Sequence, residues 1–312
     1  MITSLGGGVG AGKFLKGLAL AADGEKPSVI VNTADDIRLW GLNISPDIDT
    51  VIYWLCGLVD KKKGWGIRGD SFNFIGSLRA LGEEAWFNIG DGDLAVHILR
   101  TRMLAEGKTL SGATREISRR LGADSKAEVF PMTDARVETW IDTGGGEMHF
   151  QEYYIRRRMK PRPLGVRFRG IETAAPAPGV AEAIRDAEKI IICPSNPVIS
   201  VGPVLGVPGV REAVREARAP VAAISPIVGG RALKGPADRL MRAQGHEVSP
   251  LGVARMYADF LSLMVIDRTD ASYAPLIEKE GIAALVADTV ISDARAAEAL
   301  ARRTLEKLDS LR

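Results

Sequence analysis

The stretch Met1–Lys13, MITSLGGGVGAGK, opens the chain and decides its fold class. A short apolar segment runs into a glycine-rich turn, and Phe14, Leu15 and Leu18 then supply apolar positions at helical spacing. This order predicts a strand, a tight turn and an amphipathic helix. Glycines at such a turn let successive backbone N–H groups converge on an anion at the helix N-terminus. The stretch therefore predicts a phosphate-binding loop, with a purely structural turn as the alternative.

The glycine loop fits two known motifs, each incompletely. Gly7 to Lys13 has the G-x-x-x-x-G-K spacing of a P-loop, but Phe14 stands where that motif needs a hydroxyl for magnesium. Gly6, Gly8 and Ala11 fit the looser dinucleotide fingerprint G-x-G-x-x-G/A. A P-loop kinase or GTPase is disfavoured by Phe14.

Length and composition narrow the class of protein. The 312 residues suffice for one large or two ordinary domains, and 46% hydrophobic with 26% charged residues is typical of a globular protein. The 41 basic and 39 acidic residues give a net charge of +2, which argues against a nucleic-acid partner. Cys56 and Cys193 have no metal-ligand spacing and suggest free thiols in a reducing compartment. With no membrane-spanning stretch and no signal peptide, we expect a cytoplasmic protein without membrane association.

Strands and helices alternate along most of the chain. The pattern predicts strands at 28–31, 189–193, 221–225, 263–267 and 284–287, and helices at 48–59, 71–81, 93–106, 109–121, 208–217, 236–244, 252–261 and 293–308. Between them, 127–132, 136–142, 148–155 and 166–171 favour strands, with a hairpin turn at Gly144–Gly146. We expect a single α/β domain over 1–312, a doubly wound, mostly parallel Rossmann-like sheet. A helical and antiparallel insertion at 60–175 should cover the substrate cleft.

Four carboxylates follow the second predicted strand. Asp35, Asp36, Asp47 and Asp49 fall within fifteen residues, after a buried strand and at the start of a helix. Because ligands of such folds bind beyond the carboxyl ends of the strands, these side chains are candidates for a magnesium site. The alternative is that Asp47 and Asp49 only cap the next helix.

Two later junctions add polar groups. Gly90–Asp93 precedes a predicted helix, with His97 one turn further on, although a turn and cap would use the same residues. Pro194–Pro197 ends the strand at 189–193, and its prolines hold Ser195 and Asn196 in a rigid loop. Such a loop favours recognition of a base or sugar, with a plain turn as the alternative.

The joint order of these motifs is specific, although any one of them is common. They are the glycine loop before Lys13, Asn32 with Asp35–Asp36, Ser45–Thr50, Gly64–Gly66 with Asp70–Phe72, Gly90–His97, His149–Glu152, Pro194–Val198, Ser225–Ile227 and Gly235–Ala237. Together they resemble the 2-phospho-L-lactate transferase family of deazaflavin coenzyme F-420 biosynthesis, which includes phosphoenolpyruvate transferase members. The resemblance extends to at least residue 270.

The resemblance implies a reaction and a set of site residues. A GDP-linked three-carbon acid donates its phospho-acid unit to the ribityl hydroxyl of the deazaflavin Fo, GMP leaves, and coenzyme F-420-0 or its dehydro form results. By resemblance, the enzyme is a phosphotransferase for substituted phosphate groups (EC 2.7.8), a homodimer, with Mg²⁺ as cofactor. The residues implied are Asp35 and Asp49 for metal and catalysis, Gly8, Gly10, Lys13, Ser195 and Asn196 for the nucleotide, and Asp49, Asn88 and His149 for the deazaflavin.

Some points stay open within the resemblance. Gly92 stands where the family usually has Arg, and Arg38 or Arg68 are candidate replacements. No residue type in the sequence discriminates among the three donor acids, which are lactyl, enolpyruvyl and glyceryl. We also expect aromatic residues of the insertion to wall the deazaflavin pocket, namely Trp65, Trp86, His149 and Tyr153.

The alternative function is a nucleotide-sugar-binding regulatory protein of the related gluconeogenesis-factor group, which is not an enzyme. That group shares the glycine loop, the Asn-x-x-Asp-Asp segment and the doubly wound sheet. Here Ile37–Gly41 follows the carboxylate pair and the Ser45–Thr50 segment is present, which favours the transferase.

Overall fold

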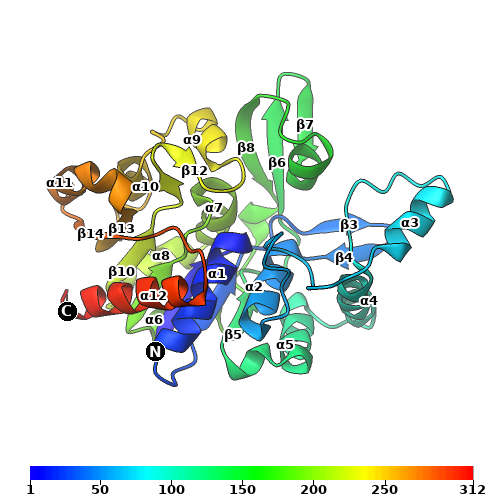
Figure 1. The fold of residues 1–312 in the computed structure, drawn as a ribbon, viewed down its shortest axis with the longest axis horizontal. Coiled ribbons are helices and arrows are strands. Elements are labelled where there is room, and N and C mark those ends of the chain that lie inside the picture. The colour runs from blue at the N-terminus through cyan, green and yellow to red at the C-terminus, as the bar shows by residue number, and fades with distance from the viewer. Residues whose placement is uncertain (312) are drawn as a thin grey trace.

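Seven parallel strands form the central sheet of the computed structural model, which describes residues 1–311 (Figure 1). Their spatial order is β14–β13–β10–β9–β1–β2–β5. The chain builds the sheet outward from β1 in one direction and then outward from β9 in the other. The predicted doubly wound parallel sheet is confirmed, and its switch point lies between β1 and β9. The strands are β1 (Ile2–Gly6), β2 (Ser28–Val31), β5 (Glu128–Pro131), β9 (Lys189–Ile192), β10 (Val221–Ile224), β13 (Leu263–Asp267) and β14 (Ala283–Ala287).

Helices cover both faces of this sheet, so its strands are apolar on both sides. Alternate residues of one strand enter opposite cores: Leu5 packs into one hydrophobic cluster and Ile2 into the other. One face carries α1 (Gly8–Ala21), α2 (Pro46–Cys56), α5 (Leu110–Leu121) and α12 (Ala294–Asp309). The other carries α6 (Val180–Arg185), α7 (Gly202–Gly206), α8 (Val210–Glu216), α9 (Ala237–Ala243), α10 (Pro250–Met256) and α11 (Ala274–Lys279).

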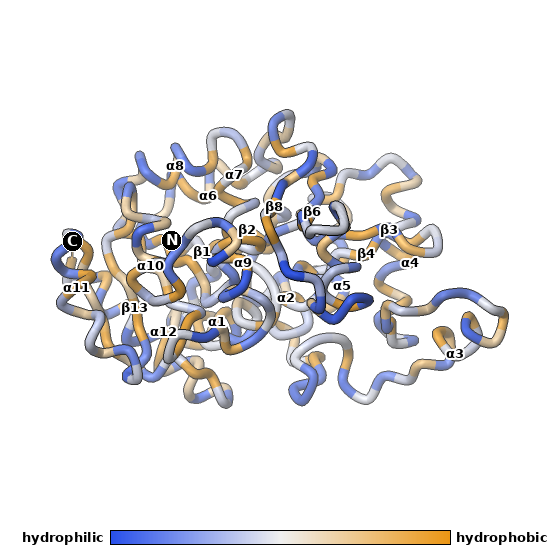
Figure 2. Tube along the Cα trace, turned by 90° about the horizontal axis from the view of Figure 1, so that it is seen from above, coloured by the Kyte–Doolittle hydropathy of each residue, from blue (hydrophilic) through white to orange (hydrophobic). Residues whose placement is uncertain are grey.

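The segment 60–175 contributes to the sheet and also extends beyond it. Its strand β5 pairs with β2 as the edge of the central sheet. A separate antiparallel sheet in the order β7–β6–β8 follows, and helix α3 projects from the main body in both views (Figure 2). The hairpin predicted at Gly144–Gly146 joins β6 to β7. These elements are α3 (Asn73–Ala80), α4 (Asp91–Ala105), β6 (Glu138–Thr143), β7 (Gly146–His149) and β8 (Pro163–Arg169).

Three local predictions are wrong. The strand expected over 148–155 ends at His149, and a π-helix, η2 (Glu152–Arg156), takes its place. The helix expected over 252–261 ends at Met256. A hairpin of β3 (Ile37–Leu39) and β4 (Leu42–Ile44) lies where we expected none; Trp40 and Gly41 turn it with φ of 48° and 78°.

The remaining elements are short. They are β11 (Ile227–Val228), β12 (Arg231–Ala232), η1 (Ala123–Ser125), η3 (Ile171–Thr173), η4 (Pro197–Val201) and η5 (Arg268–Tyr273). Among the described residues, no helix has the length and apolar character needed to cross a bilayer.

Candidate functional site

A cavity of about 580 Å³ lies at the carboxyl ends of the strands, across the switch point between β1 and β9. Loops after β1, β2, β9, β10 and β14 all reach it. It brings together most of the residues predicted from the sequence: Gly8, Gly10, Lys13, Asp35, Asp49, Asn88, Ser195 and Asn196. Of residues 1–311, His149 is not among those that line it, although its neighbours Phe150 and Gln151 are.

The glycine loop needs its glycines for conformation and for space. Gly8 begins α1 with a φ of +72°, in the left-handed region. A Cβ on Gly10 would lie 2.0 Å from the carbonyl oxygen of Pro194, so only glycine lets the loops after β1 and β9 approach this closely. No side chain of the described residues caps α1, and its first turn carries no carboxylate. Its N-terminal N–H groups are therefore suited to an anion in the cavity.

Ser195 and Asn196 stabilise the loop after β9, which contacts the glycine loop. The Ser195 hydroxyl accepts from the Gly7 N–H at 3.2 Å and donates to the Gly7 carbonyl at 3.0 Å. Since one hydroxyl bonds both polar groups of Gly7, it ties the two loops together. Asn196 caps η4, because its Oδ1 accepts from the N–H groups of Val198 (3.0 Å) and Ile199 (3.3 Å).

Two lysines supply positive charge to this end of the cavity. The Lys13 ammonium donates to the carbonyl of Ile291 at 2.9 Å, and that of Lys234 donates to the carbonyl of Lys63 at 2.7 Å. Neither forms an ion pair with any described residue. Burial, and then the nearby charge of Lys13, lower the pKa of Lys234. Gly92 stands where the family usually has Arg, and Arg38 and Arg68 are the candidates to replace that positive charge. Neither of them is among the described residues that line the cavity.

Three of the four clustered carboxylates, Asp35, Asp47 and Asp49, line the cavity; within the described chain, Asp36 does not. Its Oδ2 instead accepts from the Ser45 hydroxyl at 2.6 Å. Burial raises the pKa of Asp35, and the charge of Asp47 raises it further. Burial also raises the pKa of Asp47 to about 6, against the opposing effect of its hydrogen bond from Asn32. No described residue forms an ion pair with either carboxylate, and Asp35 Oδ1 is buried without a hydrogen-bond partner among those residues.

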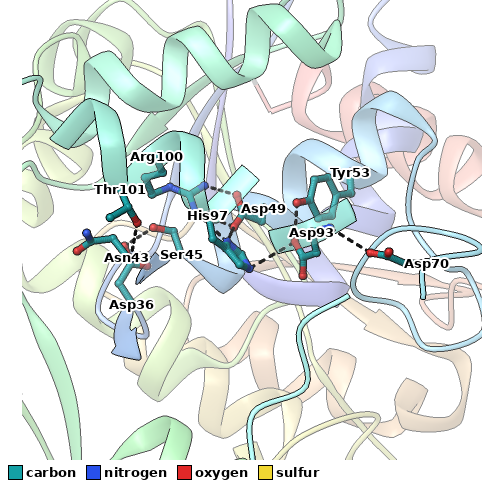
Figure 3. Close-up of polar contacts among 10 residues, drawn as sticks. All are labelled: Asp36, Asn43, Ser45, Asp49, Tyr53, Asp70, Asp93, His97, Arg100 and Thr101. Atoms are coloured by element: carbon teal, nitrogen blue, oxygen red, sulfur yellow. Dashed lines mark hydrogen bonds and ion pairs between the residues drawn. The ribbon is translucent and has the colours of Figure 1, made fainter. Parts of the chain in front are cut away.

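Asp49 has the opposite environment (Figure 3). Arg100, fully buried on α4, donates from Nη1 to Asp49 Oδ2 at 3.0 Å and from Nη2 to Oδ1. Burial alone would raise the pKa of Asp49, but the Arg100 guanidinium and His97 outweigh it and hold that pKa below its ordinary value. A bidentate guanidinium fixes a carboxylate in orientation as well as in charge.

His97 extends this network along α4. Its Nδ1 lies 3.4 Å from Asp49 Oδ2, and its Nε2 lies 3.6 Å from Asp93 Oδ1 (Figure 3). The Tyr53 hydroxyl donates to the same Asp93 oxygen at 2.6 Å. Burial would lower the pKa of His97, but Asp49 and Asp93 raise it to about 9. Asp49, Asp93 and His97 have the composition of a metal site, and Arg100 pairs with both Asp49 oxygens, each of which keeps a further lone pair.

The other end of the cavity is aromatic. Phe87, Phe150 and Tyr154 line it, and the last two rings stack with centroids 5.4 Å apart. Asn88 lies beside them and accepts from Arg79 Nη2 at 3.2 Å.

Of the aromatic residues expected here, Trp65 lines the cavity, whereas Trp86 and Tyr153 are not among the described lining residues. Tyr153 packs in the core instead, and its neighbour Tyr154, also in η2, lines the cavity. His149 bonds its own segment: its Nδ1 accepts from the Gln151 N–H at 3.2 Å. Burial lowers the pKa of His149.

Sequence reasoning missed Arg100, Tyr53 and Lys234. The spacing of Asp93, His97 and Arg100, four and then three residues, places them on one helix face and was a usable signal. Tyr53 likewise lies four residues after Asp49 on α2. No local pattern marks Lys234, whose position depends on the loop after β12.

Known proteins resemble this chain over nearly its whole length. The family described as 2-phospho-L-lactate transferase CofD matches residues 2–307. A 2-phospho-L-lactate transferase of Methanosarcina mazei is 40% identical over 295 residues, covering 95% of this chain and 96% of the relative. A phosphoenolpyruvate transferase of Streptomyces griseus is 41% identical over 317 residues, covering 100% of this chain and 99% of the relative.

Among solved structures, a member of the UPF0052 family from Bacillus halodurans has a similar fold. Its TM-score is 0.66 at 17% identity, covering 97% of this chain and 98% of the other. At that identity the likeness shows the fold alone. The regulatory alternative is not favoured, because the relatives at 40% and 41% identity are named transferases. The match over residues 2–307 and the two transferase relatives show the family: this chain is a transferase of the 2-phospho-L-lactate transferase family.

Proposed function

We propose that this enzyme transfers a phospholactyl or phosphoenolpyruvyl unit from its GDP-linked form to the terminal ribityl hydroxyl of Fo. The hydroxyl oxygen forms a bond to the phosphorus that bears the acid, the bridging P–O bond breaks, GMP leaves, and the hydroxyl proton is released. The product is coenzyme F-420-0 or its dehydro form, and the reaction class is transfer of a substituted phosphate group. From the family resemblance we also infer a cytoplasmic homodimer.

One observation carries the proposal: a single cavity is lined by the glycine loop with two lysines, by three carboxylates and by aromatic rings. Such a site can hold a nucleotide and a flat tricyclic ring at once, with their reacting groups between them. The two donor names among the relatives match the two acids proposed.

The nucleotide would bind at the glycine loop. The N–H groups at the start of α1 would donate to the diphosphate, with Lys13 and Lys234 beside it. Both ammonium groups are held only by backbone carbonyls among the described residues, so neither has a competing carboxylate. Asn196 would contact the nucleoside with its amide nitrogen, because its oxygen caps η4.

Magnesium fits the carboxylates that line the cavity. Asp35 offers a buried oxygen without a hydrogen-bond partner among residues 1–311, and no described cation balances it or Asp47. We propose that Asp35 and Asp49 hold the ion, with Asp47 next to them. Mg²⁺ bound there would neutralise charge on the diphosphate. Asp49, fixed by Arg100, would also accept from the attacking hydroxyl and orient it.

The deazaflavin would bind at the aromatic end. Phe87, Phe150 and Tyr154 offer flat surface for its ring, and Asn88 offers an exposed amide at the edge. His149 stays a predicted contact of the deazaflavin. Because it is not among the described residues that line the cavity, the end of β7 would have to move toward the cavity for this contact to form.

Mass spectrometry of the products tests the proposal. The protein would be incubated with Fo, GTP, Mg²⁺, a suitable guanylyltransferase and each phospho-acid in turn. We expect GMP and the Fo phosphodiester in equal amounts, with one acid preferred. Formation of GMP that does not depend on Fo, or no phosphodiester with any of the acids, would contradict the proposal.

A further inference from the structure

Asp93 and His97 form a pair whose role the reaction above leaves open. They lie one turn apart on α4 (Figure 3), and both residues line the cavity. On one side the pair contacts Asp49, from the first turn of α2. On the other side, Asn88 of the aromatic end precedes α4 by three residues. The Asp93–His97 pair therefore adjoins the carboxylates by contact and Asn88 along the chain.

The pair has an unused hydrogen-bonding atom. His97 is 2% exposed, and its Nε2 has no hydrogen-bond partner among the described residues. Asp93 Oδ1, 3.6 Å away, is beyond hydrogen-bond distance. A buried ring nitrogen without a partner is costly, so a bound molecule that supplies one is favoured.

The surroundings decide which chemical group suits this position. Asp93 Oδ1 already accepts from Tyr53, but the Asp93 side chain is 12% exposed and can accept from another donor. A phosphate would have to compete with Asp49 and Asp93 for Arg100 and His97, which already pair with these carboxylates. A metal ion at the pair would have to share Asp49 with Arg100, so that only Asp93 and His97 of this cluster offer it unshared ligands. A hydroxyl both donates and accepts, so one such group can donate to Asp93 and accept from a protonated Nε2.

We propose that the Asp93–His97 pair binds hydroxyl groups of a polyol chain, and that this chain is the ribityl side chain of the deazaflavin acceptor. The inference rests on the proposed function and adds a subsite to it. The ring would lie against the aromatic residues, and the pair would hold the chain so that its terminal hydroxyl reaches Asp49. Selection for a hydroxylated side chain then resides in α4, separately from recognition of the ring.

Titration calorimetry with two ligands tests this subsite. The ligands are Fo and the same deazaflavin ring with a methyl group in place of the ribityl chain, each measured with and without Mg²⁺. We expect His97→Phe to weaken Fo binding about tenfold to hundredfold, the effect of a lost buried hydrogen bond, and to leave the methyl analogue within about twofold. His97→Gln, which keeps a polar atom near Nε2, should recover part of the Fo affinity. His246→Phe, the same change at an exposed histidine, should alter neither.

Several results would overturn the proposal. An equal loss for both ligands would show that His97 only supports the fold of the pocket. A loss of Fo affinity confined to buffer with Mg²⁺ would indicate a cation at the pair instead of a hydroxyl. If His97→Phe does not fold, Asp93→Asn decides the matter, since it should weaken Fo and spare the analogue. Tight binding of Fo that neither variant weakens would refute the subsite alone, whereas no binding of Fo to the unmodified protein would refute the proposed function with it.

Discussion

The aspartates of this cavity show how one residue type acquires different properties from its surroundings. Asp35, Asp47 and Asp49 are all buried, yet the pKa of the first two is raised by burial and that of Asp49 is held low by Arg100 and His97. The sequence predicts that these carboxylates gather, because they follow one strand. It cannot predict which of them is paired, because the guanidinium comes from a helix 51 residues further along the chain.

Asp35→Asn separates the metal role from the structural one. We expect turnover at saturating Mg²⁺ to fall about hundredfold or more, because a neutral amide cannot balance the cation. The free energy of unfolding in metal-free buffer should not fall, because a buried charge beside Asp47 is removed. Product formation and urea denaturation measure the two effects.

Asp36→Asn is the matched control at the next position. It keeps an acceptor for the Ser45 hydroxyl and lies outside the residues described as lining the cavity, so its turnover should stay close to that of the parent. Turnover of Asp35→Asn near the parent level would refute the assignment of Asp35 to the metal.

At the scale of elements, Asn196 has two roles: it caps η4, and it belongs to the loop that we propose binds the nucleotide. Asn196→Ala should weaken GDP binding more than Fo binding, because Asn196 lines the cavity in the loop that we propose holds the nucleotide. It should also destabilise the protein by about 1 kcal/mol through loss of the cap on η4. Calorimetry with each ligand and chemical denaturation measure these separately.

Asn196→Asp distinguishes the two roles of this residue. A carboxylate keeps the capping oxygen, so stability should be retained, but it removes the amide donor and adds a negative charge near the diphosphate. We expect GDP affinity to fall as far as in the alanine variant, or further. An equal loss of GDP and Fo affinity in both variants would count against the proposal that Asn196 contacts the nucleotide.

Elements with strong periodicity or clear end signals were predictable, and others were not. Strand β1, helix α12 and the Gly144–Gly146 turn follow from apolar spacing and glycine chemistry. The β3–β4 hairpin was missed because its turn uses Trp40, a bulky residue rarely found at positive φ. The segment after His149 alternates like a strand, but Tyr153 packs into the core and the chain winds into η2.

At the scale of the whole molecule, the architecture was more predictable than the site. Alternating strands and helices imply a doubly wound sheet, and such a sheet binds ligands at its switch point. That argument located the cavity and most of the glycine-loop and carboxylate residues that line it. It could not locate Arg100 or Lys234, because their roles depend on contacts between segments far apart in sequence and not on any local pattern.

The switch point itself depends on close approach of the loops after β1 and β9. In Gly10→Ala the new Cβ would lie 2.0 Å from the Pro194 carbonyl oxygen, which is backbone, so the two loops must separate. We expect GDP binding to weaken by more than about tenfold and the melting temperature to fall, because the nucleotide would bridge the two halves of the sheet there. Gly76→Ala, the same change inside α3 with open space around it, should leave GDP binding unchanged and raise stability by up to about 1 kcal/mol. Calorimetry and thermal unfolding of both variants provide the comparison. If Gly10→Ala bound GDP as tightly as Gly76→Ala, the nucleotide could not lie across the two loops, since their separation would then have no effect on its contacts.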